Sequence, residues 1–177
     1  AASDVYKRQV WAAGNNSYGQ LGNLTFTESN IPVQVYGLFD VKQISAGNGF
    51  CIAVCDCGYV WYWGENQNIV KRINELYGID SVSASYYNKY AIKTDGSVFA
   101  WGDNAYGSLG NGNKEIVYSP EQLSITNVKQ VVGTPKSTIF LKNDGTLWAC
   151  GSNVHKILGD GSEKTQTLPV KVMNVSN

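Results

Sequence analysis

Short apolar runs recur along the chain in groups of three, and each group predicts three neighbouring β-strands. The groups cover residues 41–47, 50–54 and 59–63; 80–85, 89–93 and 97–101; and 128–134, 138–142 and 146–150. Cys57-Gly58, Asp95-Gly96 and Asp144-Gly145 separate the second run from the third. Asp-Gly between two apolar runs indicates a hairpin turn, because glycine accepts a positive φ without steric cost. Cys57 therefore occupies a turn position.

The third run of each group carries large side chains at alternate positions and closes on a glycine. Alternation places Trp61 with Trp63, and Phe99 with Trp101, on one face of a strand. The closing glycines are Gly14, Gly64, Gly102 and Gly151, at intervals of 50, 38 and 49 residues. A repeat near 50 residues built from short strands is typical of the blades of a β-propeller, in which wide aromatic side chains fill the space between neighbouring blades.

A loop rich in asparagine and glycine follows three of the closing glycines, and a proline follows each loop. The loops end at Gly22, Gly110 and Gly159, and the prolines at positions 32, 120 and 169 each lie ten residues further on. Proline at the start of residues 31–35 favours an edge strand. The copy at Gly64 lacks the loop, and residues 68–76 after it read as a strand plus a loop rather than a helix.

One asparagine after each closing glycine has a structural and a functional interpretation. These residues are Asn16, Asn66, Asn104 and Asn153. An asparagine side chain in a loop usually bonds nearby backbone groups, and we expect that role here, with ligand binding as the alternative. Residues 1–9 do not fit the repeat and read as a foreign scar or a fragment end. The repeats themselves occupy residues 10–177.

Composition narrows the functional classes. The 14 Lys and Arg residues balance the 14 Asp and Glu residues, so the basic excess of a nucleic-acid-binding protein is absent. No apolar run is long enough for a transmembrane helix, and the first residues carry no apolar signal-peptide core, although an upstream signal on a longer chain stays open. The sequence leaves localisation undecided.

The sequence predicts no catalytic, cofactor-binding or metal-binding residues. His155, the one histidine, aligns with Tyr18 and Tyr106 and reads as a loop substitution. A metal or a disulfide site is conceivable at the four cysteines, but one histidine is few for zinc, and we expect ordinary cysteines at positions 51, 55, 57 and 150. An enzyme is the weaker alternative, because Ser45, Ser83 and Ser85 of the innermost runs have no partner base.

Together these motifs identify a family. An aromatic residue, Gly-x-Asn, Gly-x-Leu-Gly, proline, Ser-Ala-Gly and Asp-Gly in this order resemble the RCC1-like repeat, the regulator-of-chromosome-condensation family, over about residues 10–177. The resemblance implies an all-β partial propeller of about three and a half blades out of a probable seven. We therefore expect a fragment whose remaining blades are supplied by missing chain. The histidine usual in the inner hairpin of the family is replaced here, at Phe50, Asn88 and Ser137.

The sequence combines a regular repeat with no readable set of catalytic residues. This combination favours a non-enzymatic platform on which loops of one propeller face bind an unknown protein partner. The tips of the inner hairpins vary while the strands repeat, and aromatic residues at tips are common interface anchors. The candidate tip residues are Asn48, Phe50, Tyr86, Tyr87, Asn88 and Lys136. The alternatives are that these aromatic residues only pack on neighbouring loops, or that the chain acts as a guanine-nucleotide exchange factor for a small GTPase or as a secreted enzyme inhibitor.

Overall fold

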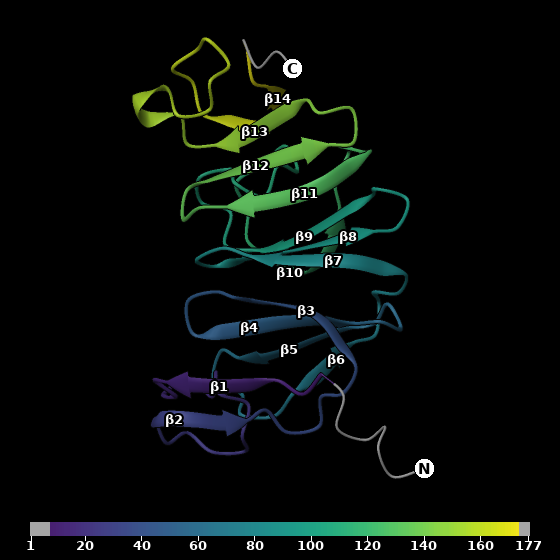
Figure 1. Ribbon diagram of the computed structural model, residues 1–177. Helices are drawn as coiled ribbons and strands as arrows, with labels where there is room; N and C mark the ends of the chain where they lie inside the picture. Colours follow the sequence, from purple (N-terminus) through teal and green to yellow (C-terminus); the bar gives the residue numbers. More distant parts are fainter. Residues whose placement is uncertain (1–7, 174–177) are drawn as a thin grey trace. The chain divides into compact units, whose positions relative to one another are not determined.

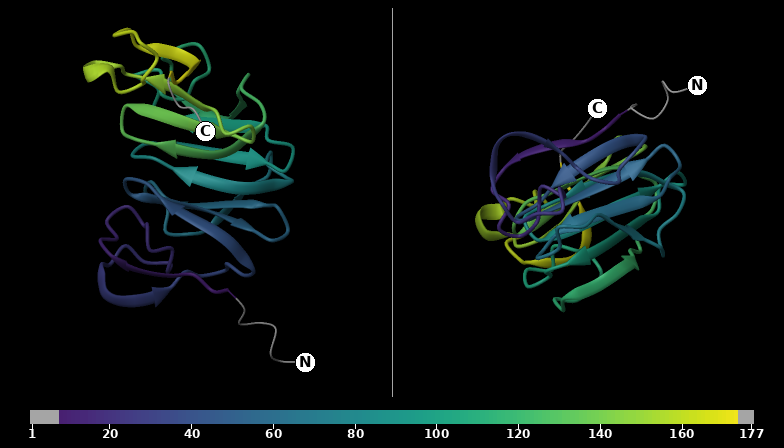
Figure 2. Two further views of the ribbon diagram at one scale, coloured as in Figure 1. Left: turned by 45° about the horizontal axis from the view of Figure 1, so that its top comes forward. Right: turned by 90° about the horizontal axis from the view of Figure 1, so that it is seen from below.

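The computed structural model describes residues 8–173, and these residues are all-β apart from one short 3₁₀ turn (Figures 1 and 2). Most of the non-repeat segment 1–9 lies outside the described residues, and Arg8 and Gln9 belong to no strand. The chain divides into two compact units, residues 1–82 and 83–177.

The first unit contains a two-stranded and a four-stranded antiparallel sheet, the latter in the order β3-β4-β5-β6. Apolar side chains of both sheets share one core, which includes Val10, Val35 and Trp63. The short β6 confirms the prediction of a strand plus a loop at residues 68–76. The strands are β1 (Trp11–Gly14), β2 (Ser29–Gln34), β3 (Val41–Ala46), β4 (Phe50–Cys55), β5 (Val60–Gly64) and β6 (Lys71–Ile73).

Two further four-stranded sheets follow, in the orders β10-β9-β8-β7 and β11-β12-β13-β14. In the second unit the Tyr90 ring of β8 meets the Phe140 ring of β12 edge-on, with centroids 6.5 Å apart, inside a core shared by both sheets. The elements are β7 (Ile79–Ala84), β8 (Asn88–Lys93), β9 (Val98–Gly102), β10 (Val117–Gln122), β11 (Val128–Gly133), β12 (Ser137–Lys142), β13 (Leu147–Gly151), the 3₁₀ turn η1 (Val154–Lys156) and β14 (Gln166–Lys171).

Each proline that follows a loop by ten residues lies on an outermost strand. Pro32, Pro120 and Pro169 belong to β2, β10 and β14, which end their sheets. Proline has no N–H to donate, so an edge strand accommodates it without loss of a ladder hydrogen bond. The edge strand predicted at residues 31–35 is therefore confirmed, and the strands of Pro120 and Pro169, at the same distance from their loops, are edge strands as well.

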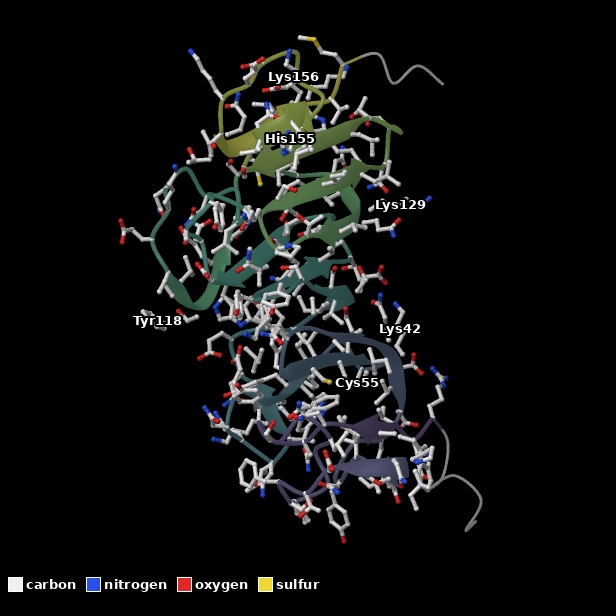
Figure 3. All side chains as sticks on the ribbon, turned by 90° about the vertical axis from the view of Figure 1, so that its left-hand side faces the viewer. Lys42, Cys55, Tyr118, Lys129, His155 and Lys156 are labelled. Atoms are coloured by element: carbon white, nitrogen blue, oxygen red, sulfur yellow. A yellow bond between two sulfur atoms is a disulfide. The ribbon has the colours of Figure 1, made fainter. Side chains whose placement is uncertain are left out.

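The three hairpin turns predicted from sequence are present, but one contains a disulfide. Gly58, Gly96 and Gly145 have φ of 77°, 79° and 81°, in the left-handed region that glycine favours. Cys57 lies in its turn as predicted, whereas the expectation of four ordinary cysteines is wrong, because Cys57 is bonded to Cys55 (Figure 3). Two cysteines separated by one residue at a turn have side chains close enough to form a disulfide. The repeat already explained Cys57 as a turn residue, so the sequence offered no separate reason to expect the bond.

Among residues 8–173, strand β1 has one unpaired edge, and this predicts self-association. Within this range it pairs only with β2, and Trp11 is 56% exposed, whereas its repeat equivalents Trp61, Phe99 and Trp148 are partly buried. An open strand edge beside an exposed aromatic side chain favours pairing with another chain. We expect concentration-dependent association of the 177-residue chain in sedimentation velocity.

A charged residue at position 11 tests whether the open edge of β1 causes the self-association. Trp11→Lys should shift the distribution toward monomer, because a charged side chain on an edge strand opposes pairing. Tyr36→Lys is the control, since Tyr36 is 65% exposed but lies outside the strands. A single monomer for the unaltered chain at all concentrations, or an equal effect of the two variants, would show that β1 is not the contact.

Candidate functional site

The turn between β7 and β8 presents two tyrosines on a rigid backbone. The Ser85 N–H donates to the Asn88 carbonyl (2.8 Å), and the Asn88 N–H donates to Ser85 Oγ (3.3 Å). Tyr86 and Tyr87 are 45% and 46% exposed, and their rings meet edge-to-face with centroids 4.5 Å apart. Both ends of the turn are thus held by hydrogen bonds, while the two rings stay accessible.

Tyr106 and Lys136 lie at the same end of the strands. Asn88 pairs with Gly102, so the loop after β9, which contains Tyr106, begins beside the tyrosine turn. Ser137 pairs with Gly151 in the same way, so Lys136 occupies the equivalent turn of the neighbouring sheet. Lys136 Nζ is 5.0 Å from the Tyr106 ring centroid, a cation–π contact between the two sheets of this unit. We call Tyr86, Tyr87, Tyr106 and Lys136 the aromatic loop surface.

Thr134 holds the turn that carries Lys136. Its N–H donates to the Ser137 carbonyl (2.7 Å), and its Oγ1 accepts the N–H of Lys136 (3.3 Å) and of Ser137 (3.0 Å). The Lys136 carbonyl accepts the N–H of Ser152 from the loop after β13 (2.8 Å). The backbone at Lys136 is therefore fixed by hydrogen bonds, and the residue is exposed.

The prediction of an exposed position at a loop tip is wrong for two of the six candidate residues. Phe50 is 1% exposed and Asn88 is 2% exposed, so neither is available at the surface. Each is the first residue of a strand and lies opposite a closing glycine, Gly64 or Gly102, whose missing side chain leaves room for it. Asn48, Tyr86, Tyr87 and Lys136 are exposed as predicted. Alignment of the repeats cannot distinguish the last turn residue from the first strand residue.

A buried polar cluster supports the tyrosine turn from below. Asn88 Nδ2 donates to Ser108 Oγ (2.9 Å), and the Tyr90 hydroxyl lies 3.0 Å from the Ser108 carbonyl oxygen and 2.7 Å from Thr138 Oγ1. Burial raises the pKa of Tyr90 above its usual range, so the hydroxyl stays protonated. The cluster ties the loop after β9 to β8 and β12, which carry the turns of the aromatic loop surface. Sequence reasoning missed it, because Ser108 and Thr138 have no distinctive spacing.

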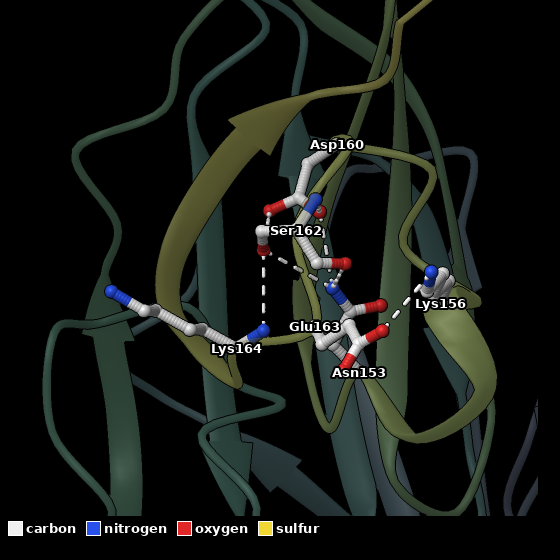
Figure 4. Close-up of polar contacts among 6 residues, drawn as sticks. All are labelled: Asn153, Lys156, Asp160, Ser162, Glu163 and Lys164. Atoms are coloured by element: carbon white, nitrogen blue, oxygen red, sulfur yellow. Dashed lines mark hydrogen bonds and ion pairs between the residues drawn. The ribbon is translucent and has the colours of Figure 1, made fainter.

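Buried asparagines organise the loops after three closing glycines, which confirms the structural interpretation of Asn16, Asn104 and Asn153. The Oδ1 of Asn16, Asn104 and Asn153 accepts the N–H of the leucine five residues later, in each case at 2.9 Å. The Nδ2 of Asn153 donates to Asp160 Oδ1 (3.0 Å) and to the Ser162 carbonyl (2.9 Å), as Figure 4 shows. Asn66, in the copy without the loop, is exposed.

Metal-ligating side chains do not cluster in the part of the chain that the structure describes. No group of three His, Cys, Asp or Glu residues that could hold a metal occurs between residues 8 and 173. His155 is exposed in η1 with a φ of 65°, a loop position as predicted. Among the same residues, no helix has the length and apolar character required to cross a membrane.

Comparison with known families agrees with this repeated architecture. The regulator of chromosome condensation (RCC1) repeat matches residues 9–54, 95–141 and 144–177, and a second description of the same repeat matches residues 79–108. The chain belongs to the RCC1 repeat family. Residues 55–78, which neither description covers, contain β5 and β6, the part of the RCC1 array where the loop after the closing glycine is missing.

Curated relatives of this RCC1 chain are longer proteins. It is 30% identical over 148 residues to the probable E3 ubiquitin-protein ligase HERC6 of Homo sapiens, an alignment that covers 74% of this chain and 14% of the relative. It is 29% identical over 134 residues to the ultraviolet-B receptor UVR8 of Arabidopsis thaliana, with 67% and 30% covered. The chain therefore spans less than a third of either relative.

Solved RCC1-type structures confirm the fold. Human WBSCR16 superposes with a TM-score of 0.81 at 21% identity, over 93% of this chain and 48% of that one. Prp20p of Saccharomyces cerevisiae gives 0.81 at 16% identity, over 94% and 48%. These identities show the fold alone. The predicted partial RCC1 propeller is confirmed, because the blade-like sheets cover about half of each of these chains.

Proposed function

We propose that this RCC1 repeat chain is a non-enzymatic protein-interaction module and that a partner protein binds the aromatic loop surface. The observation that supports the proposal is the pair Tyr86 and Tyr87, each nearly half exposed on a turn fixed by hydrogen bonds. Tyrosine adds large contact area and a hydroxyl while it loses little conformational entropy on binding. A rigid turn reduces that entropic cost further.

Charge and composition support a protein as the partner class. The chain has no net charge, so it lacks the basic excess that neutralises phosphates in complexes with nucleic acid. Lys136 adds one cation beside the Tyr106 ring. Aromatic residues are enriched at protein–protein interface cores, where charged residues are few.

The relatives support binding in general terms. The structure of Prp20p is described together with its binding to Gsp1p and histones, and another structure holds the same yeast protein bound to Kap60. These partners belong to Prp20p, of which this chain covers 48%. They support the view that a propeller of this family serves as a platform for other proteins.

Removal of both tyrosine rings should weaken partner binding strongly. We expect Tyr86→Ala with Tyr87→Ala to reduce affinity about 30-fold or more, the size of effect that aromatic anchors produce at interface centres. The partner is first isolated with the full-length protein from its native source, and its dissociation constant is then measured by calorimetry.

Tyr118→Ala provides the matched control. Tyr118 is 89% exposed on the outermost strand β10 and projects from it (Figure 3), so its removal deletes an equally large exposed ring elsewhere. The control should keep full affinity, and both variants should keep the circular dichroism spectrum of the unaltered chain. Unchanged affinity in the double variant would show that the aromatic loop surface is not the binding surface.

A further inference from the structure

The disulfide between Cys55 and Cys57 lies in the β4–β5 turn, at the opposite end of the strands from the β3–β4 turn. Cys55 is 3% exposed, whereas Cys57 is exposed. The two residues are separated only by Asp56, so the bond closes a very short loop. A disulfide restricts the unfolded chain less as the loop it closes becomes shorter, so this bond contributes less to stability than a long-range one.

The corresponding turns of the other sheets fold without a disulfide. Gly58, Gly96 and Gly145 each donate their N–H to the carbonyl three residues earlier, at 3.0, 2.9 and 3.0 Å. In the two sister turns, Asp95 and Asp144 occupy the position of Cys57, and their carboxylates accept the N–H two residues later at 2.8 and 2.9 Å. The hairpin therefore has a stable form with aspartate at this position, and its geometry does not require the bond.

A groove of about 500 Å³ runs beside the disulfide and is lined by Phe39, Asp40, Asp56 and Trp61 as well as the two cysteines. The matching groove of the β11–β14 sheet is about 260 Å³. There Lys142, at the position equivalent to Cys55, places its Nζ 5.4 Å from the Trp148 centroid. The β3–β6 sheet thus has a disulfide and a groove of larger volume where its sister has a lysine on an aromatic ring.

We propose that Cys55 and Cys57 form a thiol–disulfide exchange site whose substrate is a thiol carried on an uncharged, apolar group. Phe39 is 51% exposed and Trp61 is partly exposed, so the groove offers apolar surface to the carrier. Asp40 and Asp56 place two carboxylates there. Asp56 forms an ion pair with Arg8 at 2.6 Å, whereas Asp40 has no ion-pair partner among residues 8–173, so its negative charge is not compensated within that range. This charge disfavours an anionic carrier. The site is independent of the aromatic loop surface.

The exchange proceeds in two displacements. A thiolate R–S⁻ attacks the exposed Sγ of Cys57, the Cys55–Cys57 bond breaks, and Cys55 leaves as a thiolate that takes a proton from water. A second R–S⁻ then attacks the R sulfur of the mixed disulfide, R–S–S–R forms, and Cys57 leaves as a thiolate that also takes a proton from water. Overall, two R–SH groups are oxidised to R–S–S–R and the protein disulfide is reduced to two cysteine thiols. The Tyr59 carbonyl oxygen, 3.5 Å from Cys55 Sγ, can accept a hydrogen bond from the reduced thiol.

Two small thiols test the site on the native chain. 2-Mercaptoethanol and 2-mercaptoethanesulfonate share a thiol-ethyl unit and differ in charge. Reduction is followed by alkylation and mass spectrometry, and we expect two reactive thiols per chain. Cys51 and Cys150 should stay unmodified, because burial raises their pKa values to about 11 and about 12. The neutral thiol should react about threefold faster at low ionic strength, and salt should reduce this difference.

Stability measurements decide between exchange and a purely structural bond. Cys57→Asp installs the residue of the sister turns, and both this variant and the reduced chain should melt within about 5 °C of the oxidised chain. Reduction that occurs only in denaturant, or a loss of more than about 10 °C on reduction, would overturn the proposal. Equal rates for the two thiols at low ionic strength would overturn the assigned substrate class.

Single-cysteine variants test which sulfur is attacked. Cys55→Ser keeps the exposed thiol and Cys57→Ser keeps the buried one. With 2-mercaptoethanol disulfide, the Cys55→Ser chain should form its one-to-one mixed disulfide at least about tenfold faster, because access limits thiol exchange. Equal rates in the two variants would show that Cys57 is not the entry point.

Discussion

Replacement of Gly151 by alanine is expected to lower the free energy of unfolding by about 4 kcal/mol or more. Gly151 has a φ of 105°, which side chains rarely adopt, and a Cβ there would overlap the Lys136 carbonyl and the Ser137 backbone of β12. Neighbouring backbone atoms cannot move aside as a flexible side chain can. The alanine must therefore separate β12 from β13 or force a new backbone path.

Gly14→Ala isolates the conformational part of this cost. Gly14 closes β1 with a φ of 112°, yet a Cβ there would have no heavy atom within 4 Å. We expect this variant to lose about 2 kcal/mol, the cost of an unfavourable φ alone. Urea unfolding measures both values as shifts of the midpoint at constant slope. Equal losses in the two variants would show that contact with β12 does not restrict position 151.

Replacement of Asn104 by aspartate is expected to cost about 3 kcal/mol, although the two side chains have nearly the same shape. Asn104 is completely buried, and its Nδ2 donates to Asn111 Oδ1 (2.9 Å) and to the Asn113 carbonyl (3.0 Å). Aspartate places a carboxylate oxygen against these two acceptors and leaves a buried charge. The loop between β9 and β10 would then lose the centre that holds it.

Asn66→Asp is the matched control, because Asn66 is exposed and follows a closing glycine whose loop is missing. It should change stability by less than about 0.5 kcal/mol. The introduced carboxyl at position 104 should have a raised pKa in the folded state. Its deficit relative to the unaltered chain should therefore be smaller below the unfolded pKa of aspartate and reach its full value as pH rises through the folded pKa. A pH-independent loss would argue against a buried charge.

Much of the architecture was predictable because local backbone chemistry recurs at fixed intervals. Positive φ favours glycine, so the turns at Gly96 and Gly145 and the ends of strands at Gly102 and Gly151 are visible in the sequence. Proline lacks a donor, so Pro120 marks the edge of its sheet. Because these requirements act within a few residues, the repeat, the strands and the family followed from the sequence by itself.

The candidate sites depended on contacts between segments, and only the tertiary structure decided these. Exposure of Tyr86 and Tyr87 was predictable because they occupy the middle of a turn, but Phe50 is buried because it pairs with Gly64, a partner 14 residues away. The contact of Lys136 with Tyr106 and the bond between Cys55 and Cys57 depend on side-chain directions and distances in space. Sequence periodicity determines which face a residue occupies within its own strand, whereas packing between strands decides whether that face is open to a partner.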